Sequence, residues 1–524
     1  MRSSQTLSDE AFRAHLNQRI GGLLTLAVYV SRNASVKKYF TRPLLADLLS
    51  ESTRIEELLD VYGAKNNNRW HPLRQTVAPI KLFSNVNYIL MHIVHFLPNY
   101  GLLPIDEDFP KATEKALSFI CSVLVKSMRI LIRQAEELGL EIPDSVPALE
   151  SFGDDILNGH LVSDRPKQKV ASPEETVVYL ATAFLNLSGQ SNFLHAVQNQ
   201  HVDDYADWIP DPISEERLRN LEEMFHNLQS LYDTYISESN VETLDEDLPV
   251  LRGHITVIYH LLETATAITH YCERHILSLG SCPTPSVTGL VDPGKLLNIL
   301  VNYSVAFASS YITRTRSLCH EMLKRYAIKG RVTVSAPRFR GFHVRPSTLV
   351  AKIVSHYGSE VQMNLTGETY NAGVTLDLFR ANEKINAEKK RWLRAEVHKL
   401  VNAYTSGDVG NIEGDAVAMD HMEKLTHNAL QTLFSQNKLV LYERNLSLGD
   451  IAAMPEEAVA EYIIRALVQL LTMGKIDVVM DINVIFLGDQ RVLQDIKLLA
   501  DNGYGEDDFG NNLPLPEKLS YLRR

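Results

Sequence analysis

The chain has 524 residues, 45% of them hydrophobic, and this is enough to bury sizeable cores in about three or four domains. Its formal net charge of −12 argues against general nucleic-acid binding, so we expect no nucleic-acid partner. The cysteines lie far apart without a CxxC pair, and Met1 to Leu16 is polar without a signal-peptide pattern, which together indicate a reducing cytoplasm.

Residues 1–150 predict a helical domain. Apolar residues recur at helical spacing in Asp9–Val30, Pro43–Val61, Val77–Phe96 and Ala112–Leu138. The longest apolar run near the start, Ile20 to Val30, is too short to cross a bilayer, so we expect no membrane span. The stretch from Glu141 to Ala171 is rich in proline, glycine, aspartate and serine, which predicts a domain boundary or a long surface loop.

Residues 170–330 predict a second helical domain that ends in a long helix. Ser172-Pro173-Glu174-Glu175 forms a capping box with proline at the first helical position. Asp292-Pro293-Gly294 begins a helix that can extend from Lys295 to Ile328 without glycine or proline. At ~1.5 Å per residue this helix would be ~50 Å long.

The stretch from Arg331 to Arg380 differs from the rest because strand and helix patterns alternate in it. Its first residues alternate between apolar and polar, which predicts a half-buried strand, and the next helix ends at Gly358. A strand pair follows, Glu360–Leu365 with Gly367–Asn371, and then a short amphipathic helix from Val374 to Arg380.

The motif Gly341-Phe342-His343-Val344-Arg345-Pro346 lies where the first strand meets the helix. Proline suits the first helical turn, so we expect Pro346 to open the helix and the N–H groups of Ser347 and Thr348 to point back at the imidazole of His343. Arg345 adds a guanidinium fork for phosphate oxygens, and a neutral imidazole is a competent nucleophile near pH 7. The pattern favours a histidine that accepts a phosphoryl group; an ordinary loop histidine is the alternative.

The motif GFHVRPST, its helix and the GETYNAG hairpin resemble HPr, the histidine phosphocarrier of the bacterial phosphoenolpyruvate:sugar phosphotransferase system. The resemblance covers residues 331–380. It implies an α+β domain of the open-faced β-sandwich type, with His343 as phosphoryl acceptor, Arg345 as phosphate stabiliser, and an enzyme I-like phosphohistidine protein as donor. It also implies a docking surface beside the histidine, formed here by Arg338, Thr348, Thr375, Leu376 and Phe379.

The resemblance requires a fourth strand and a third helix, which residues 382–395 do not supply. Ile476 to Leu487 contains strand-like runs, and Asp489 to Ala500 reads as a helix with one apolar stripe. We therefore predict an HPr-like domain made of 331–381 and 475–503, a helical insertion at 382–474 and an irregular tail at 504–524. The alternative is a truncated carrier fold followed by a separate C-terminal domain.

The remaining clusters of polar residues do not complete a site. The Glu223-x-x-His226 pair has no second copy, and the group from His270 to His275 does not share one helical face, so we expect no metal and no cofactor. The basic tract Lys389-Lys390-Arg391 predicts an exposed helix face.

The sequence therefore predicts a mainly α protein with one embedded α+β domain. Because a carrier domain needs only part of this length, we expect His343 to receive a phosphoryl group and the helical body to read out or relay that state to an effector protein. We therefore expect the protein to be a regulatory phosphoryl acceptor rather than a stand-alone enzyme. The alternative is a non-catalytic scaffold that uses the HPr-like fold as a docking module.

Overall fold

The computed structural model describes residues 6–33, 40–144, 161, 162, 164, 172–195, 209–237, 239–276, 290–406, 419–442 and 458–523. The chain divides into two compact units, Met1–Met322 and Leu323–Arg524. Most of the predicted boundary at 141–171, Cys282 and the ends of the predicted inserted helices near residues 415 and 455 lie outside the described residues.

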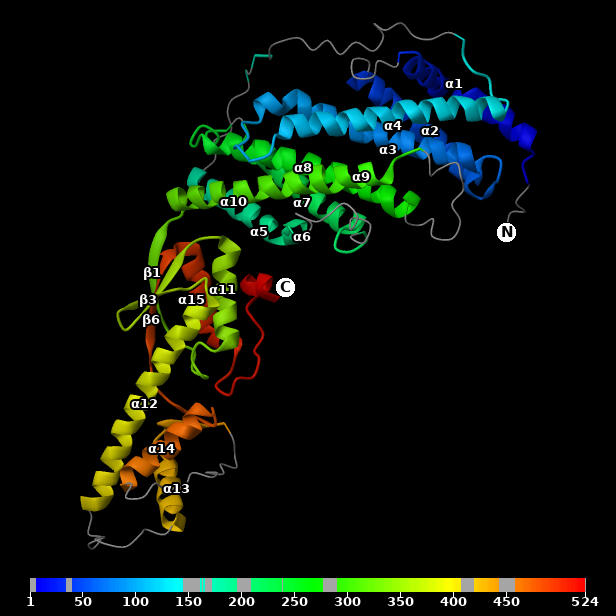
Figure 1. Ribbon diagram of the computed structural model, residues 1–524. Coiled ribbons are helices and arrows are strands. Elements are labelled where there is room, and N and C mark those ends of the chain that lie inside the picture. Colours follow the sequence, from blue (N-terminus) through cyan, green and yellow to red (C-terminus); the bar gives the residue numbers. More distant parts are fainter. Residues whose placement is uncertain are drawn as a thin grey trace. The chain divides into compact units, whose positions relative to one another are not determined.

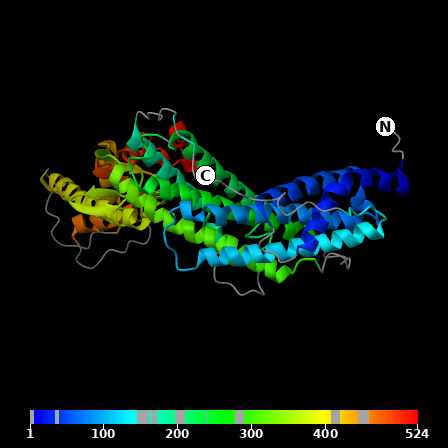
Figure 2. The ribbon, with the colours of Figure 1, turned by 90° about the horizontal axis from the view of Figure 1, so that it is seen from above.

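The N-terminal unit consists of helices, as predicted for both of its parts. Its elements are α1 (Asp9–Arg32), α2 (Arg42–Val61), α3 (His71–Phe96), α4 (Phe109–Glu137), α5 (Pro173–Gln190), α6 (Asn192–His195), α7 (Glu215–Tyr235) and α8 (Asp247–Tyr271), with short 3₁₀ or π turns at Ala64–Asn66, Leu97–Asn99 and Cys272–Ile276. The long helices lie side by side in both views of the ribbon (Figures 1 and 2). Since α3 packs against both α4 and α8, the two predicted helical regions share one core.

The long helix predicted from Lys295 is present. It begins at α9 (Pro293–Ile299), passes through a π-helical segment (Leu300–Val305) and continues as α10 (Ala306–Tyr326). The side chain of Asp292 caps its start by accepting a hydrogen bond from the amide of Lys295 at 3.1 Å. The π-helical segment is the one interruption that the residue pattern did not indicate.

Two helical segments are long and apolar enough to cross a membrane by length and composition alone, His71–Asn99 and Pro293–Tyr326. Of the most apolar window in each, 61% and 67% respectively is buried inside the structure. Helices at the core of a helical bundle pass the same test, so this observation is weak evidence for a membrane and the expected absence of a span stays a prediction.

The C-terminal unit contains a four-stranded antiparallel sheet with the order β1-β6-β2-β3. The strands are β1 (Lys329–Ser335), β2 (Val361–Leu365), β3 (Glu368–Asn371) and β6 (Asn483–Asp489). Phe486 of β6 lies opposite Val332 on one side and Met363 on the other. The late strand thus lies between β1 and β2, which confirms the prediction that a strand after the inserted segment completes this sheet.

Helices cover one face of the sheet. α11 (Val344–Tyr357) and α15 (Gln490–Asp501) pack against each other, and α15 also packs on β1 and β6 (Figure 1). Buried residues alternate along the strands, as expected when only one face is covered. The core between the layers is apolar and includes Phe342, Val350, Ile353, Met363, Phe486, Val492, Ile496 and Leu499.

The predicted strand Ile476–Leu487 is two strands in the structure. Its first part, β5 (Ile476–Val478), pairs with β4 (Leu439–Leu441) in a separate two-stranded sheet, and only β6 joins the larger sheet. Exposed or half-buried residues separate the two strands. A run of apolar residues does not indicate which neighbouring strand each part will pair with.

The predicted helices Val374–Arg380 and Glu383–Tyr404 form one continuous helix, α12 (Thr375–Ser406). Its first part contributes Leu378, Ala381 and Ile385 to the core beneath the sheet, and its later part contributes Leu393 and Val397 to a second core. That second core also contains residues of α13 (Met419–Ser435), α14 (Val459–Thr472), β4 and β5. Residue 382 is therefore not a structural boundary.

The C-terminal tail is more ordered than predicted. Residues 503–505 and 517–523 form 3₁₀ helices, and Tyr504, Leu515, Leu519 and Leu522 belong to the core of the sheet domain. The hydroxyl of Tyr504 donates to the carbonyl of Ser335 at 2.8 Å. The apolar residues of the tail are too few and irregularly spaced to predict this packing.

Candidate functional site

His343 is the N-cap residue of α11, and its side chain makes no capping hydrogen bond. The helix begins at Val344, earlier than predicted. The amide of Ser347 consequently donates to the carbonyl of His343 at 3.1 Å, and Thr348 lies inside the helix. The prediction that these two amides are free was wrong, because the first turn uses them; the free donors at this helix end are the amides of Val344 and Arg345.

The imidazole of His343 contacts a carboxylate from the far end of the chain. Nε2 of His343 lies 2.8 Å from Oε2 of Glu506, and the Glu506 side chain is only 5% exposed. An ionised carboxylate can only accept hydrogen bonds, so we assign the proton to Nε2. Nδ1 then carries the free lone pair, and it has no hydrogen-bond partner in the described part of the chain.

Arg345 completes the polar group around His343. Its Nε atom lies 3.8 Å from Oε1 of Glu506, which is beyond hydrogen-bonding distance. This Nε is buried and has no partner among the described residues. The guanidinium of Arg345 therefore has an N–H group that could donate to an anion bound next to Glu506.

A strained turn precedes the site. Arg340 and Gly341 both have positive φ, 52° and 63°, and for arginine this conformation is unfavourable. The turn is held from outside: the amide of Arg340 donates to Asp477, its guanidinium to the carbonyl of Gly474, and its carbonyl accepts from Asn382. These three partners lie in α12 and at the end of the inserted segment, so the inserted segment fixes the backbone before His343.

Lys389 is buried rather than exposed, which corrects the prediction for the basic tract. Its ammonium group lies 2.7 and 2.8 Å from the two carboxylate oxygens of Asp477, and each side chain is 5% exposed. The same carboxylate receives the amide of Arg340. A buried ion pair thus links α12 and β5 to the turn before His343.

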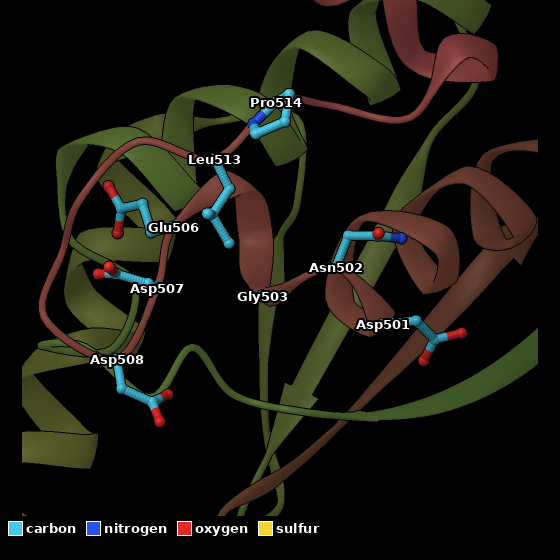
Figure 3. Close-up of a pocket in the computed structure, with 8 residues that line it drawn as sticks. All are labelled: Asp501, Asn502, Gly503, Glu506, Asp507, Asp508, Leu513 and Pro514. Atoms are coloured by element: carbon cyan, nitrogen blue, oxygen red, sulfur yellow. The ribbon is translucent and has the colours of Figure 1, made fainter.

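A loop that we name the strap, Gly505–Leu513, lies against this turn. Its ends are joined by a hydrogen bond from the amide of Leu513 to the carbonyl of Gly505 at 2.8 Å. An open pocket of about 540 Å³ lies beside it, bordered by Glu506, Asp507 and Asp508 on one side and by Asp501 at the end of α15 on the other (Figure 3). The surroundings of His343 are therefore acidic as well as basic.

Apart from Arg338, the predicted docking residues lie in the first turns of two contacting helices, α11 and α12. Leu376 is 60% exposed, whereas Thr348, Thr375 and Phe379 are partly buried. Arg338 is exposed and forms a loose ion pair with Asp508 at 3.6 Å. His343 contacts Glu506 of the strap and is partly covered, whereas Leu376 is exposed.

The other clusters do not form sites in the structure. Nδ1 of His270 contacts Glu215 at 2.8 Å, Glu273 accepts the amide of Glu215, and Cys272 is buried. Among the described residues, no group of three or more His, Cys, Asp and Glu could hold a metal ion.

In this arrangement the nitrogen of His343 that has no partner among the described residues is the candidate nucleophile. A histidine–carboxylate pair can also activate a serine or cysteine, but Ser347 is buried and its hydroxyl donates to the carbonyl of Phe342 at 2.8 Å. Glu506 was missed by the sequence reasoning. The acidic run Glu506-Asp507-Asp508 was visible, yet nothing in it indicates a partner 163 residues away.

Comparisons with family models, with curated proteins and with solved structures find no match for this chain.

Proposed function

We propose that this protein is a regulatory phosphocarrier-type protein in which His343 accepts a phosphoryl group on Nδ1. The observation that supports the proposal is the state of the imidazole: Glu506 holds Nε2, and Nδ1 has no partner in the described part of the chain. Arg345, two residues further along the chain, has a guanidinium Nε without a partner among the described residues, 3.8 Å from Glu506. The HPr-like pattern of residues 331–380 adds an independent reason from the sequence.

The step needs no acid or base besides these groups. The lone pair of Nδ1 attacks phosphorus, the bond from phosphorus to the donor's imidazole nitrogen breaks, and that nitrogen keeps the electron pair. As positive charge develops on the ring, Glu506 stabilises it, and the Nε2 proton then leaves to water, so the phosphorylated ring is neutral. Arg345 and the amides at the start of α11 compensate the charge of the phosphoryl oxygens.

Labelling tests this proposal. Phosphoenolpyruvate with an enzyme I-like donor, or phosphoramidate as a small-molecule donor, should attach an acid-labile phosphate to the full chain. The variant His343→Ala should abolish the label, and Arg345→Ala should slow labelling by about tenfold or more without unfolding the protein. His356→Ala is the matched control, because His356 lies at the other end of α11 and should leave the label unchanged. Undiminished labelling of His343→Ala would refute the proposal.

A second candidate function is a docking scaffold. It is favoured by the strap, which leaves the His343 side chain only 24% exposed, and by the exposed Leu376 at the start of α12. If neither donor labels the wild-type chain, while Leu376→Asp abolishes binding of a partner protein, the scaffold is the better account.

A further inference from the structure

Glu506 lies between two groups that attract an anion, the Nε2–H of His343 and the guanidinium of Arg345. One of its oxygens accepts from Nε2 of His343, and the other lies nearest the unpartnered Nε of Arg345. The carboxylate therefore provides the negative charge between these two donors in the unphosphorylated protein.

The strap makes further contacts with the residues that precede His343. Asp508 forms an ion pair with Arg338, and Gly510 packs against the ring of Phe339. That ring in turn lies edge-on to His343, with 5.4 Å between the ring centroids. Residues 506–510 thus cover the turn that carries the histidine.

Hydrogen bonds within the strap hold its residues together, so we expect it to move as a unit. The carboxylate of Asp507 accepts from the amides of Phe509 and Asn511 at 2.9 and 2.8 Å and from the side-chain amide of Asn511. These hydrogen bonds hold the pKa of Asp507 below its usual range. Buried Tyr504 and Leu515 anchor the chain on either side of the loop.

Phosphorylation would reverse the charge relation at this contact. A phosphoryl group on Nδ1 brings about two negative charges next to Glu506, with Asp507 and Asp508 close behind it in the strap. Once the phosphorylated ring has lost its Nε2 proton, Glu506 faces a neutral ring and a negative phosphoryl group, so the attraction that now holds it is replaced by repulsion between like charges. No lysine or arginine lies within the strap to offset it.

We propose that the strap is an internal latch: Glu506 closes it over the unphosphorylated site, and a phosphoryl group on His343 releases it. This inference rests on the proposed function and names the element that reports the state of the histidine. Release uncovers Phe339 and the turn at Arg340, which are joined to the inserted segment through Tyr442, Gly474 and Asp477.

Hydrogen exchange of the full chain tests the latch. After labelling with phosphoramidate, the amides of Gly505–Leu513 should exchange about tenfold faster than before, while those of α4 stay unchanged. Glu506→Gln preserves the shape and removes the charge. In this variant we expect about threefold faster exchange before labelling, and no further increase in the molecules that mass spectrometry shows to carry the label.

Two more variants isolate the cause. Asp508→Asn removes one charge from the same loop at an exposed pair, and it should behave as the wild type. Gly510→Ala places a methyl group against the ring of Phe339, so it should lift the strap without any change of charge.

The outcomes separate the two proposals. A labelled wild type with unchanged exchange, or a Glu506→Gln response as large as that of the wild type, overturns the latch and leaves His343 as the acceptor. Absence of label on the wild type overturns the proposed function. Unchanged exchange in unlabelled Glu506→Gln overturns the latch whether or not labelling succeeds.

Discussion

Gly341 shows how closely the backbone before His343 is specified. Its φ of 63° suits glycine, and a Cβ atom there would collide with Oδ1 of Asn382. Asn382 cannot move freely, because its side-chain amide donates to the carbonyl of Arg340 at 3.1 Å. A single methyl group would therefore disturb the turn as well as strain it.

We predict that Gly341→Ala lowers the free energy of unfolding of the C-terminal unit by ~2–3 kcal/mol and slows phosphorylation of His343. Gly367→Ala is the matched control: its φ is also positive, at 87°, but nothing lies within 4 Å of the added atom. It should cost only ~1 kcal/mol. Equal losses in the two variants, measured by urea unfolding, would show that Asn382 does not hold the turn.

The chemistry of the site was predictable in part at this scale. His343 and Arg345 lie two residues apart in the chain. Their place at the start of a helix was predicted correctly from the sequence, because local propensity determines that start. The exact first residue was not predictable, and the fate of the amides of Ser347 and Thr348 depends on it. Glu506 could not be found, since its position follows from tertiary packing of the tail.

At the scale of elements, the buried pair between α12 and β5 is the connection with the largest expected effect. Removing one partner of a buried ion pair leaves the other charge without compensation, which costs ~3–5 kcal/mol. We predict a loss of this size for Lys389→Met, measured by chemical denaturation of the C-terminal unit. The turn at Arg340 should loosen with it, because Asp477 also binds that backbone amide.

Lys384→Met provides the control on the same helix, since its ion pair with Glu368 is largely exposed. It should change stability by less than ~1 kcal/mol. A comparable loss in both variants would mean that burial of the Lys389 pair contributes nothing specific.

The elements themselves followed from the sequence to differing extents. The alternation around Val484 and Phe486 identified β6, and the missing strand of the sheet indicated where it belongs. The merging of two predicted helices into α12 was not foreseen. Asn382 and Glu383 allow a helix to end but do not require it, and burial of Ile385 in the core stabilises its continuation.

At the scale of the whole molecule, the two units should respond differently to acid. His92 and His275 lie in the N-terminal unit, and burial lowers the pKa of each to about 4 from 6.5, with His260 and Arg74 respectively as the next contributors. Below pH 6.5 these histidines bind protons in the unfolded chain but stay neutral in the folded protein. The free energy of unfolding that these two histidines contribute is therefore fully present above about pH 6.5, and it is lost as the pH falls towards 4.

We predict this fall in thermal unfolding of the fragment 1–322, between pH 6.5 and about 5.5, where few carboxyl groups titrate. The double variant His92→Gln/His275→Gln should show a shallower dependence over the same range. A slope that the double variant leaves unaltered would show that other groups cause the acid sensitivity.

The length of α12 has a mechanical consequence. With 32 residues and no break, this helix is ~48 Å long. One end is embedded beside β3 and α11, and the other belongs to the core of the inserted helices. A rotation of about 5° at the sheet would displace the far end by ~4 Å, because a stiff rod converts a small angle into a distance in proportion to its length. A small rotation near His343 can therefore move a surface at the other end of α12, which is too far away for the charge of the histidine to act on it directly.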